Sequence, residues 1–192
     1  MPSDPSGASG VSDPAQSVGG LAVLVTGPLG SGKTSVAVEV GMQMEGRGEP
    51  NAVIDLDWLC WVGPGISGDR LRAVLHDNLR AVVARYRAEG VDRFVLARTM
   101  VSSAEVAGVR AALGGAALTV VRLDVTAEVA TERVRARGGG GAIGPAELAT
   151  QTELWSASSV LDADLVVAND DGPVVDTAAR ILAYLTSARP AP

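Results

Sequence analysis

Gly27-Pro28-Leu29-Gly30-Ser31-Gly32-Lys33-Thr34 matches the pattern G-x-x-x-x-G-K-[ST] over its full length. In this pattern the backbone N–H groups of a glycine-rich loop surround a polyphosphate, and the lysine reaches its terminal phosphates. Lys33 is the only lysine in the chain, although Lys and Arg together number 16. Lysine therefore stands where a compact, flexible ammonium is needed. The stretch, with Ser35 after it, predicts a phosphate-binding loop.

The residues on both sides of this loop fit the same prediction. Residues 21–26 form an apolar run rich in β-branched residues, which is typical of a buried parallel strand. Residues 35–44 have the composition of a helix. A loop between such a strand and helix lies at the positive end of the helix dipole, where anions bind. The Thr34 hydroxyl is then placed to bind magnesium.

Length and composition narrow the class of protein. With 192 residues, 47% of them hydrophobic, the chain is long enough for one domain with a sizeable core. The net charge of −6 disfavours nonspecific binding to DNA or RNA. No apolar stretch reaches transmembrane length, and the N-terminus does not resemble a secretory signal. A single cysteine, Cys60, and no zinc-binding pattern suit a reducing compartment. We expect a cytoplasmic monomer or homodimer that binds neither membranes nor nucleic acid.

The order of segments predicts the architecture. Residues 1–19 lack periodicity, so we expect a disordered tail followed by one domain over residues 20–192. The expected strands are 21–26, 52–54, 93–97, 117–123 and 164–168, and the expected helices are 35–44, 69–88, 103–113, 126–136, 145–159 and 174–185. Their alternation predicts an α/β fold, with a parallel sheet covered by helices on both faces. Ligands of such sheets bind beyond the carboxyl ends of the strands.

An acidic pair, Asp55 and Asp57, directly follows the second strand. If the chain stays extended there, the spacing of two points both carboxylates the same way. One could hold magnesium, and the other could accept a proton from an acceptor hydroxyl. Asp55 is the candidate for the metal, because the third strand is followed by Arg98 rather than by a carboxylate. The alternative is a solvated strand exit, since Asp is common in turns.

Two of the three tryptophans, Trp58 and Trp61, come directly after the acidic pair. Their rings could line an apolar or planar pocket for the acceptor. The alternative is that they pack the loop into the core. A loop after the fifth strand, residues 169–172, could likewise border a bound base or be a plain turn.

Arg133 and Arg137 lie four residues apart on one predicted helix face, just before four glycines at 138–141. The glycines predict a hinge and a short lid around residues 137–145. Arginines on a mobile lid could close over a transferring phosphoryl group. The alternative is a solvated helix end, where cations favour the helix dipole.

With these features the chain resembles the P-loop small-molecule kinases, which include shikimate, gluconate, adenylylsulfate and nucleotide kinases and chloramphenicol phosphotransferase. The resemblance spans about residues 20–187 and is carried above all by the match at 27–34. The chain is also similar to bacterial proteins labelled AAA-family or adenylylsulfate-kinase-like ATPases, which share Asp55-Leu56-Asp57-Trp58-Leu59-Cys60-Trp61. The glycine run and the tryptophan-rich loop differ from the shikimate and gluconate kinase patterns, so neither substrate is carried over.

This resemblance implies a P-loop NTPase fold, with a five-stranded parallel sheet in the order 2-3-1-4-5. It implies that Lys33 and the loop amides hold the phosphates of ATP, and that Thr34 and Asp55 hold Mg²⁺. Asp57 would engage the acceptor, with Arg98 near it, and Arg133 and Arg137 would belong to the lid.

We therefore expect an ATP-dependent kinase for a small hydroxylated or phosphorylated acceptor. The expected catalytic residues are Lys33, Asp55, Asp57, Arg133 and Arg137, and the expected acceptor residues are Asp57, Trp58, Trp61 and Arg98. One alternative is a P-loop ATPase or nucleotide-binding switch that has no acceptor. Another is a degenerate domain that binds nucleotide weakly and serves as an interaction module, which the intact Lys33-Thr34 pair disfavours.

Overall fold

The computed structural model describes residues 20–136 and 153–188. The predicted tail over residues 1–19, the predicted lid around 137–145 and Arg137 lie outside the described residues.

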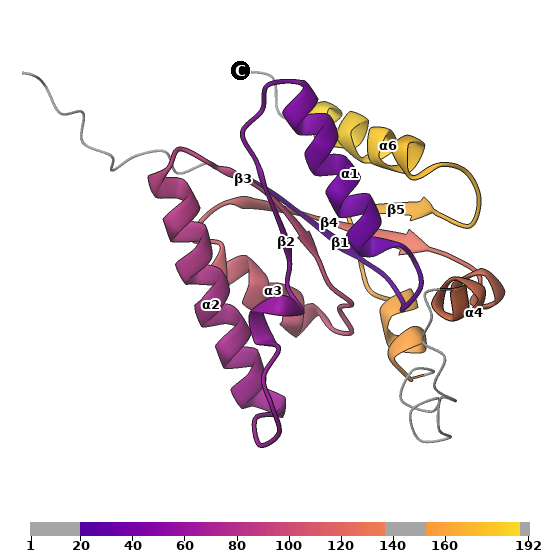
Figure 1. Ribbon diagram of the computed structural model, residues 1–192, viewed down its shortest axis with the longest axis horizontal. Helices are drawn as coiled ribbons and strands as arrows, with labels where there is room; N and C mark the ends of the chain where they lie inside the picture. Colours follow the sequence, from indigo (N-terminus) through magenta and orange to yellow (C-terminus); the bar gives the residue numbers. More distant parts are fainter. Residues whose placement is uncertain (1–19, 137–152, 189–192) are drawn as a thin grey trace, which may run out of the picture.

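The central element is one sheet of five strands (Figure 1). The strands are β1 (Leu21–Thr26), β2 (Ala52–Asp55), β3 (Arg93–Ala97), β4 (Ala117–Asp124) and β5 (Leu165–Ala168). Their order in the sheet is β2-β3-β1-β4-β5, and every neighbouring pair is parallel. The predicted order 2-3-1-4-5 is therefore confirmed, and all five carboxyl ends meet at one edge of the sheet.

Helices connect the strands. They are α1 (Lys33–Gly46), the short 3₁₀ helix η1 (Trp58–Cys60), α2 (Gly68–Ala88), α3 (Ser103–Ala112), α4 (Ala127–Ala136) and α6 (Val174–Ser187), together with a helical segment at 153–159. The prediction placed the first helix from residue 35, whereas α1 begins at Lys33, inside the phosphate-loop motif. It contained no counterpart of η1. None of the helices in the two described ranges is both long and apolar enough to cross a membrane.

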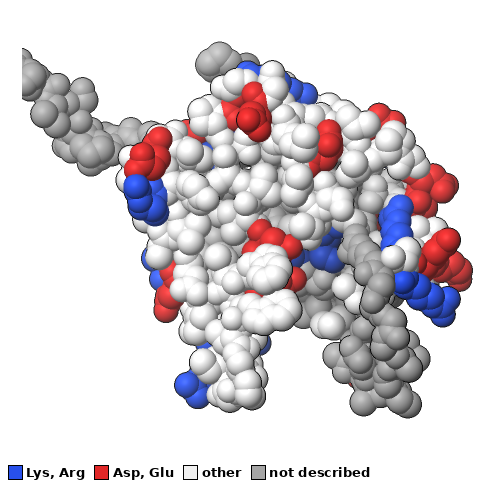
Figure 2. Space-filling view, viewed as in Figure 1, with Lys and Arg blue, Asp and Glu red and all other residues white. Residues whose placement is uncertain are grey.

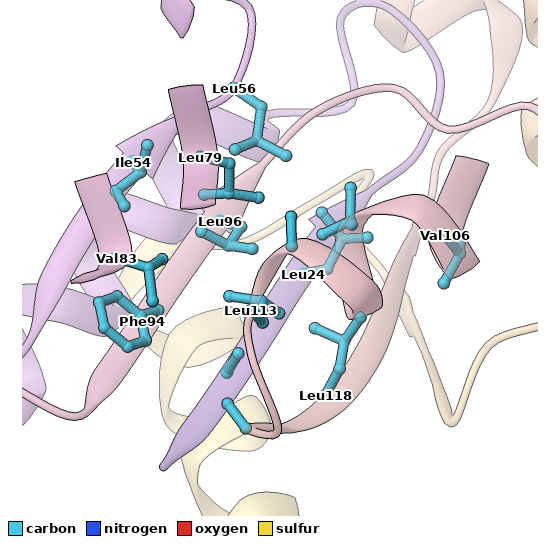
Figure 3. Packing of buried hydrophobic residues seen from close by; sticks show 14 of the residues in the cluster. Leu24, Ile54, Leu56, Leu79, Val83, Phe94, Leu96, Val106, Leu113 and Leu118 are labelled. Atoms are coloured by element: carbon cyan, nitrogen blue, oxygen red, sulfur yellow. The ribbon is translucent and has the colours of Figure 1, made fainter. Parts of the chain in front are cut away.

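The helices cover both faces of the sheet (Figure 1). On one face, α1 and α6 pack against a cluster that includes Val25 and Val95. On the other face, α2 and α3 pack against a cluster that includes Leu24 and Leu96 (Figure 3). Consecutive residues of β1 thus face opposite sides, and both sides are buried, which explains why this strand is apolar throughout.

Helix α1 passes close to the edge strand β2 at Gly41. The Asn51 side-chain amide donates a hydrogen bond to the Gly41 carbonyl over 3.2 Å. A Cβ atom at position 41 would clash with Val53 Cγ2 and lie 3.0 Å from Asn51 Oδ1. Glycine is therefore required here because the strand leaves no room for a side chain on the helix.

We expect Gly41→Ala to lower the free energy of unfolding by about 1–3 kcal/mol, the usual cost of overpacking. Gly46→Ala is the matched control, because a Cβ at this end of α1 meets nothing within 4 Å. Alanine favours helix more than glycine does, so the control should be neutral or slightly stabilising. Urea denaturation of both variants checks this, and equal stability of the two would show that α1 yields to the added methyl.

Candidate functional site

The phosphate loop is shaped by glycine backbone conformations. Gly32 is the N-cap of α1, with φ of +91°, a left-handed conformation that side chains disfavour. Gly30 also has a positive φ, and a Cβ there would clash with the carbonyl oxygen of Ala130 in α4. No side chain caps the first turn of α1. The amides of this helix end are therefore available for an anionic ligand.

Lys33 and Thr34 open α1, and their side chains contact the phosphate loop and the end of β2, respectively. The Lys33 ammonium donates a hydrogen bond to the Pro28 carbonyl oxygen over 2.9 Å, so it lies back across the loop. The Thr34 hydroxyl donates to Asp55 Oδ2 over 2.9 Å. The structure thus brings together the two residues that the sequence singled out for a metal.

The Thr34 and Asp55 oxygens fit a magnesium ion by their chemistry. Mg²⁺ prefers oxygen ligands and is usually bound by one or two protein groups, with phosphate and water completing its shell. Within residues 20–136 and 153–188, no three His, Cys, Asp or Glu side chains are grouped for a metal. A cation at Thr34 and Asp55 would therefore need nucleotide phosphates among its ligands.

The chain after β2 is not extended, so the condition under which the two carboxylates would point the same way is not met. Asp57 has φ of −65° and ψ of −34° and is the N-cap of η1. Its backbone N–H donates to Asp55 Oδ1 over 3.0 Å. A carboxylate that accepts from the amide two residues later closes a turn, which competes with extension of the strand. The single Asp55 side chain therefore contacts both Thr34 and the Asp57 backbone.

Asp57 forms an ion pair with Arg98, which directly follows β3. Arg98 Nη1 lies 2.5 Å from Asp57 Oδ1, and the side chains are 22% and 62% exposed, respectively. Acidic and basic side chains adjoin in the middle of the face shown in Figure 2. Asp57 is thus both oriented by a cation and open to solvent, so a small molecule can reach its carboxylate.

Trp58 and Trp61 stack on each other beside this ion pair. Their ring centroids are 5.1 Å apart and the planes differ by 14°. The side chains are 71% and 76% exposed, so neither ring packs the loop into the core, which was the alternative interpretation. A large apolar surface is therefore presented to solvent next to Asp57.

Arg133 lies on the other side of the phosphate loop. Its guanidinium donates to the carbonyl oxygens of Asn169 and Asp170 over 2.8 and 2.9 Å. A cavity of about 360 Å³ begins beside it; the lining residues are Gly32, Ser35, Val36, Arg133, Ala136, Asn169, Gly172 and Val174. These two bonds hold the guanidinium at the loop after β5 and leave its other N–H groups without a role in that contact.

Two polar contacts of the loop were not foreseen. The Asn169 amide donates to the Ser31 carbonyl oxygen over 2.8 Å, and Asn169 Oδ1 accepts from the Thr177 hydroxyl over 2.8 Å. The sequence offered Asn169 only as part of a loop that could border a base. Its spacing of 138 residues from Ser31 explains why no local pattern indicated this bond.

His76, the only histidine, lies on α2. It is half-buried on α2, with its ring against Gly108 of α3, where a Cβ would clash with the imidazole. Burial, followed by the nearby Arg80 charge, lowers the pKa of His76 below its usual 6.5, and the charge of Arg98 is one of the weaker influences on it. The ring of His76 therefore fills a contact between two helices, which is a packing role.

Comparisons with known proteins agree with this geometry at the level of the fold. No protein-family model matches the chain, and no curated protein sequence matches it. The APS kinase of Mycobacterium tuberculosis, solved with AMPPNP and APS, is similar in structure with a TM-score of 0.60 and 20% sequence identity, over 87% of this chain and 98% of that one.

Two further solved structures are similar over nearly their whole length. A sugar kinase from Janibacter sp. has a TM-score of 0.62 and 23% identity, over 88% of this chain and 96% of that one. A gluconokinase from Sinorhizobium meliloti has a TM-score of 0.59 and 23% identity, over 87% and 94%. With the parallel sheet order and the glycine loop before α1, these likenesses show that the chain has the α/β fold of P-loop small-molecule kinases.

Proposed function

We propose that this protein is an ATP-dependent phosphotransferase that transfers the γ-phosphoryl group of Mg-ATP to a hydroxyl of a small molecule. The observation that carries the proposal is the juxtaposition of two pairs, Thr34 with Asp55 and Asp57 with Arg98, beside the phosphate loop. The first pair suits a nucleotide-bound cation. The second offers an exposed carboxylate that an acceptor hydroxyl can reach.

Each group has a role in the proposed transfer. The loop amides and Lys33 hold the phosphates and neutralise charge that develops on the transferring group. The oxygen of the acceptor hydroxyl bonds to the γ-phosphorus, and Asp57 accepts the proton of that hydroxyl. The bond between the γ-phosphorus and the bridging oxygen of ADP breaks. Arg98 orients the Asp57 carboxylate. Magnesium, held by Thr34 and Asp55, would supply further charge neutralisation at the β- and γ-phosphates.

The cavity between Gly32, Arg133 and Asn169 is the proposed site of the nucleotide base. It adjoins the N-terminus of α1, where the phosphates would bind. It lies toward β5, whereas Asp57 follows β2, and these two strands are on opposite sides of β1 in the sheet. The APS kinase neighbour was solved with the ATP analogue AMPPNP, which supports a nucleotide in a fold of this kind. Arg133 thus borders the base in this proposal, and Arg137 stays a predicted lid residue. Cytoplasmic placement and a monomeric or homodimeric state also stay predictions.

An acceptor screen tests the proposed function. The purified chain is incubated with Mg-ATP and a library of small hydroxylated compounds while formation of ADP is followed, with a no-acceptor reaction and Lys33→Ala as controls. Turnover that depends on one acceptor and yields its phosphate ester supports the kinase. ADP formed at the same rate without any acceptor would instead identify an ATPase or a nucleotide-dependent switch.

We expect the exposed tryptophan pair to bind the part of the acceptor that does not react. Trp58→Ala and Trp61→Ala should each raise the KM for the acceptor by about ten-fold, because an aromatic contact with its buried area contributes roughly 1–2 kcal/mol. Thermal stability should hardly change, since both rings are largely exposed. Tyr86→Ala, an exposed aromatic on α2, is the control. Unchanged acceptor KM in both tryptophan variants would remove them from the acceptor site.

A further inference from the structure

Cys60 lies directly behind the ion pair between Asp57 and Arg98. It ends η1 and is only 8% exposed, although Trp58 and Trp61 on either side are largely exposed. Its Sγ atom lies 3.2 Å from Arg98 Nη1, the same nitrogen that binds Asp57 Oδ1. One nitrogen of the arginine therefore has two acceptors, a carboxylate and a thiol.

The thiol is itself oriented by the turn that contains it. Cys60 Sγ lies 3.6 Å from the Leu56 carbonyl oxygen and 3.7 Å from that of Asp57. A thiol is a weak donor and a weak acceptor. With its proton directed to these carbonyls, the sulfur lone pairs face the Arg98 guanidinium. The bond joins a turn after β2 to the end of β3, across 38 residues of sequence.

This arrangement restricts how Arg98 can bind Asp57. Arginine commonly binds a carboxylate through two parallel bonds that use both carboxylate oxygens. Here Arg98 contacts Asp57 through Oδ1, and within the described ranges no hydrogen bond occupies Asp57 Oδ2. The second carboxylate oxygen is consequently left for an acceptor hydroxyl.

We infer that Cys60 is a positioning residue for phosphoryl transfer: its sulfur holds Arg98 in single contact with Asp57 and so keeps Asp57 Oδ2 open to the acceptor. The inference rests on the function proposed above, since it gives a use to the open oxygen. Without the sulfur, the guanidinium is free to turn toward both carboxylate oxygens. Asp57 would then be a poorer proton acceptor and less accessible.

Two substitutions at position 60 separate positioning from packing. Cys60→Ser keeps a hydrogen-bond acceptor but introduces a polar group into the core, whereas Cys60→Val keeps apolar volume and removes the acceptor. We expect Cys60→Val to lower kcat about ten-fold with the KM for ATP unchanged, and Cys60→Ser to retain kcat within about two-fold. A packing role gives the opposite order, with Cys60→Val close to wild type and Cys60→Ser impaired. Val106→Ala, at another 8% exposed position of the same core cluster, controls for general loss of packing.

A second measurement does not depend on turnover. In protein labelled with ¹⁵N-arginine, with the Arg98 signals assigned through Arg98→Lys, NMR reports rotation of the Nη groups. Rotation should be faster in Cys60→Val than in wild type and in Cys60→Ser. Equal rotation in all three, or equal kcat in wild type and Cys60→Val, would overturn the role of Cys60. If the wild type shows no acceptor-dependent turnover, the proposed kinase function fails, and the rotation experiment still decides whether Cys60 anchors Arg98.

Discussion

Replacing Lys33 with alanine should lower ATP turnover by about 100-fold or more while the protein stays folded. The ammonium lies across the phosphate loop, with Nζ 2.9 Å from the Pro28 carbonyl oxygen, and a terminal phosphate would take over this contact. Its loss removes charge stabilisation of the transferring group. The side chain is only half-buried, so packing changes little.

The measurement is initial-rate ADP formation together with thermal unfolding. Arg47→Ala is the matched control, since it removes an exposed cation just beyond the other end of α1. The control should keep wild-type rates. Lys33→Arg should not rescue, because a planar, larger guanidinium does not fit where a point charge is needed. Full activity of Lys33→Ala would refute the assignment of this loop to phosphate binding.

The phosphate loop and its setting could be predicted because their determinants are local or topological. The glycines of residues 27–34 require backbone conformations that other residues disfavour, and the apolar strand before them must be buried. Once the strands are parallel, their carboxyl ends share one edge of the sheet, so Thr34 after β1 and Asp55 at the end of β2 meet. The likeness to known kinases supplied the strand order, which periodicity alone does not contain.

The details that escaped prediction depend on contacts between distant residues or on a turn. The sequence left open whether the chain from Asp55 to Asp57 is extended, and in the structure the Asp55 carboxylate binds the Asp57 amide where the chain turns into η1. That bend exposes the tryptophans and turns Cys60 inward toward Arg98. Whether the chain continues as a strand or turns depends on whether the backbone bonds to the neighbouring strand or to the Asp55 side chain. The residue types alone do not decide between these hydrogen bonds.

Substitutions of Asp57 and Asp55 should affect different constants. Asp57→Asn should lower kcat for acceptor phosphorylation by about 100-fold or more, because asparagine keeps the shape but cannot accept the proton. The dissociation constant for ATP should stay within about two-fold, since Asp57 contacts Arg98 rather than the phosphate loop. Asp55→Asn should instead raise the magnesium concentration for half-maximal rate by about ten-fold, because Asp55 Oδ2 lies at the Thr34 hydroxyl.

The effect of Asp57→Asn on transfer, compared with its effect on hydrolysis, distinguishes a kinase from an ATPase with the same fold. Titration of ATP, magnesium and acceptor against each variant gives the three constants, with Asp77→Asn as control, because it removes an exposed carboxylate paired with an arginine on α2. Loss of acceptor-independent hydrolysis in Asp57→Asn to the same extent as transfer would assign Asp57 to water activation, and thus to an ATPase. Wild-type kinetics in both Asp55→Asn and Asp57→Asn would reduce the acidic pair to a solvated strand exit. Transfer that falls while ATP affinity holds would assign Asp57 to the transfer step rather than to ATP binding, because the lost interaction would then be one that the bound ATP does not use in the ground state.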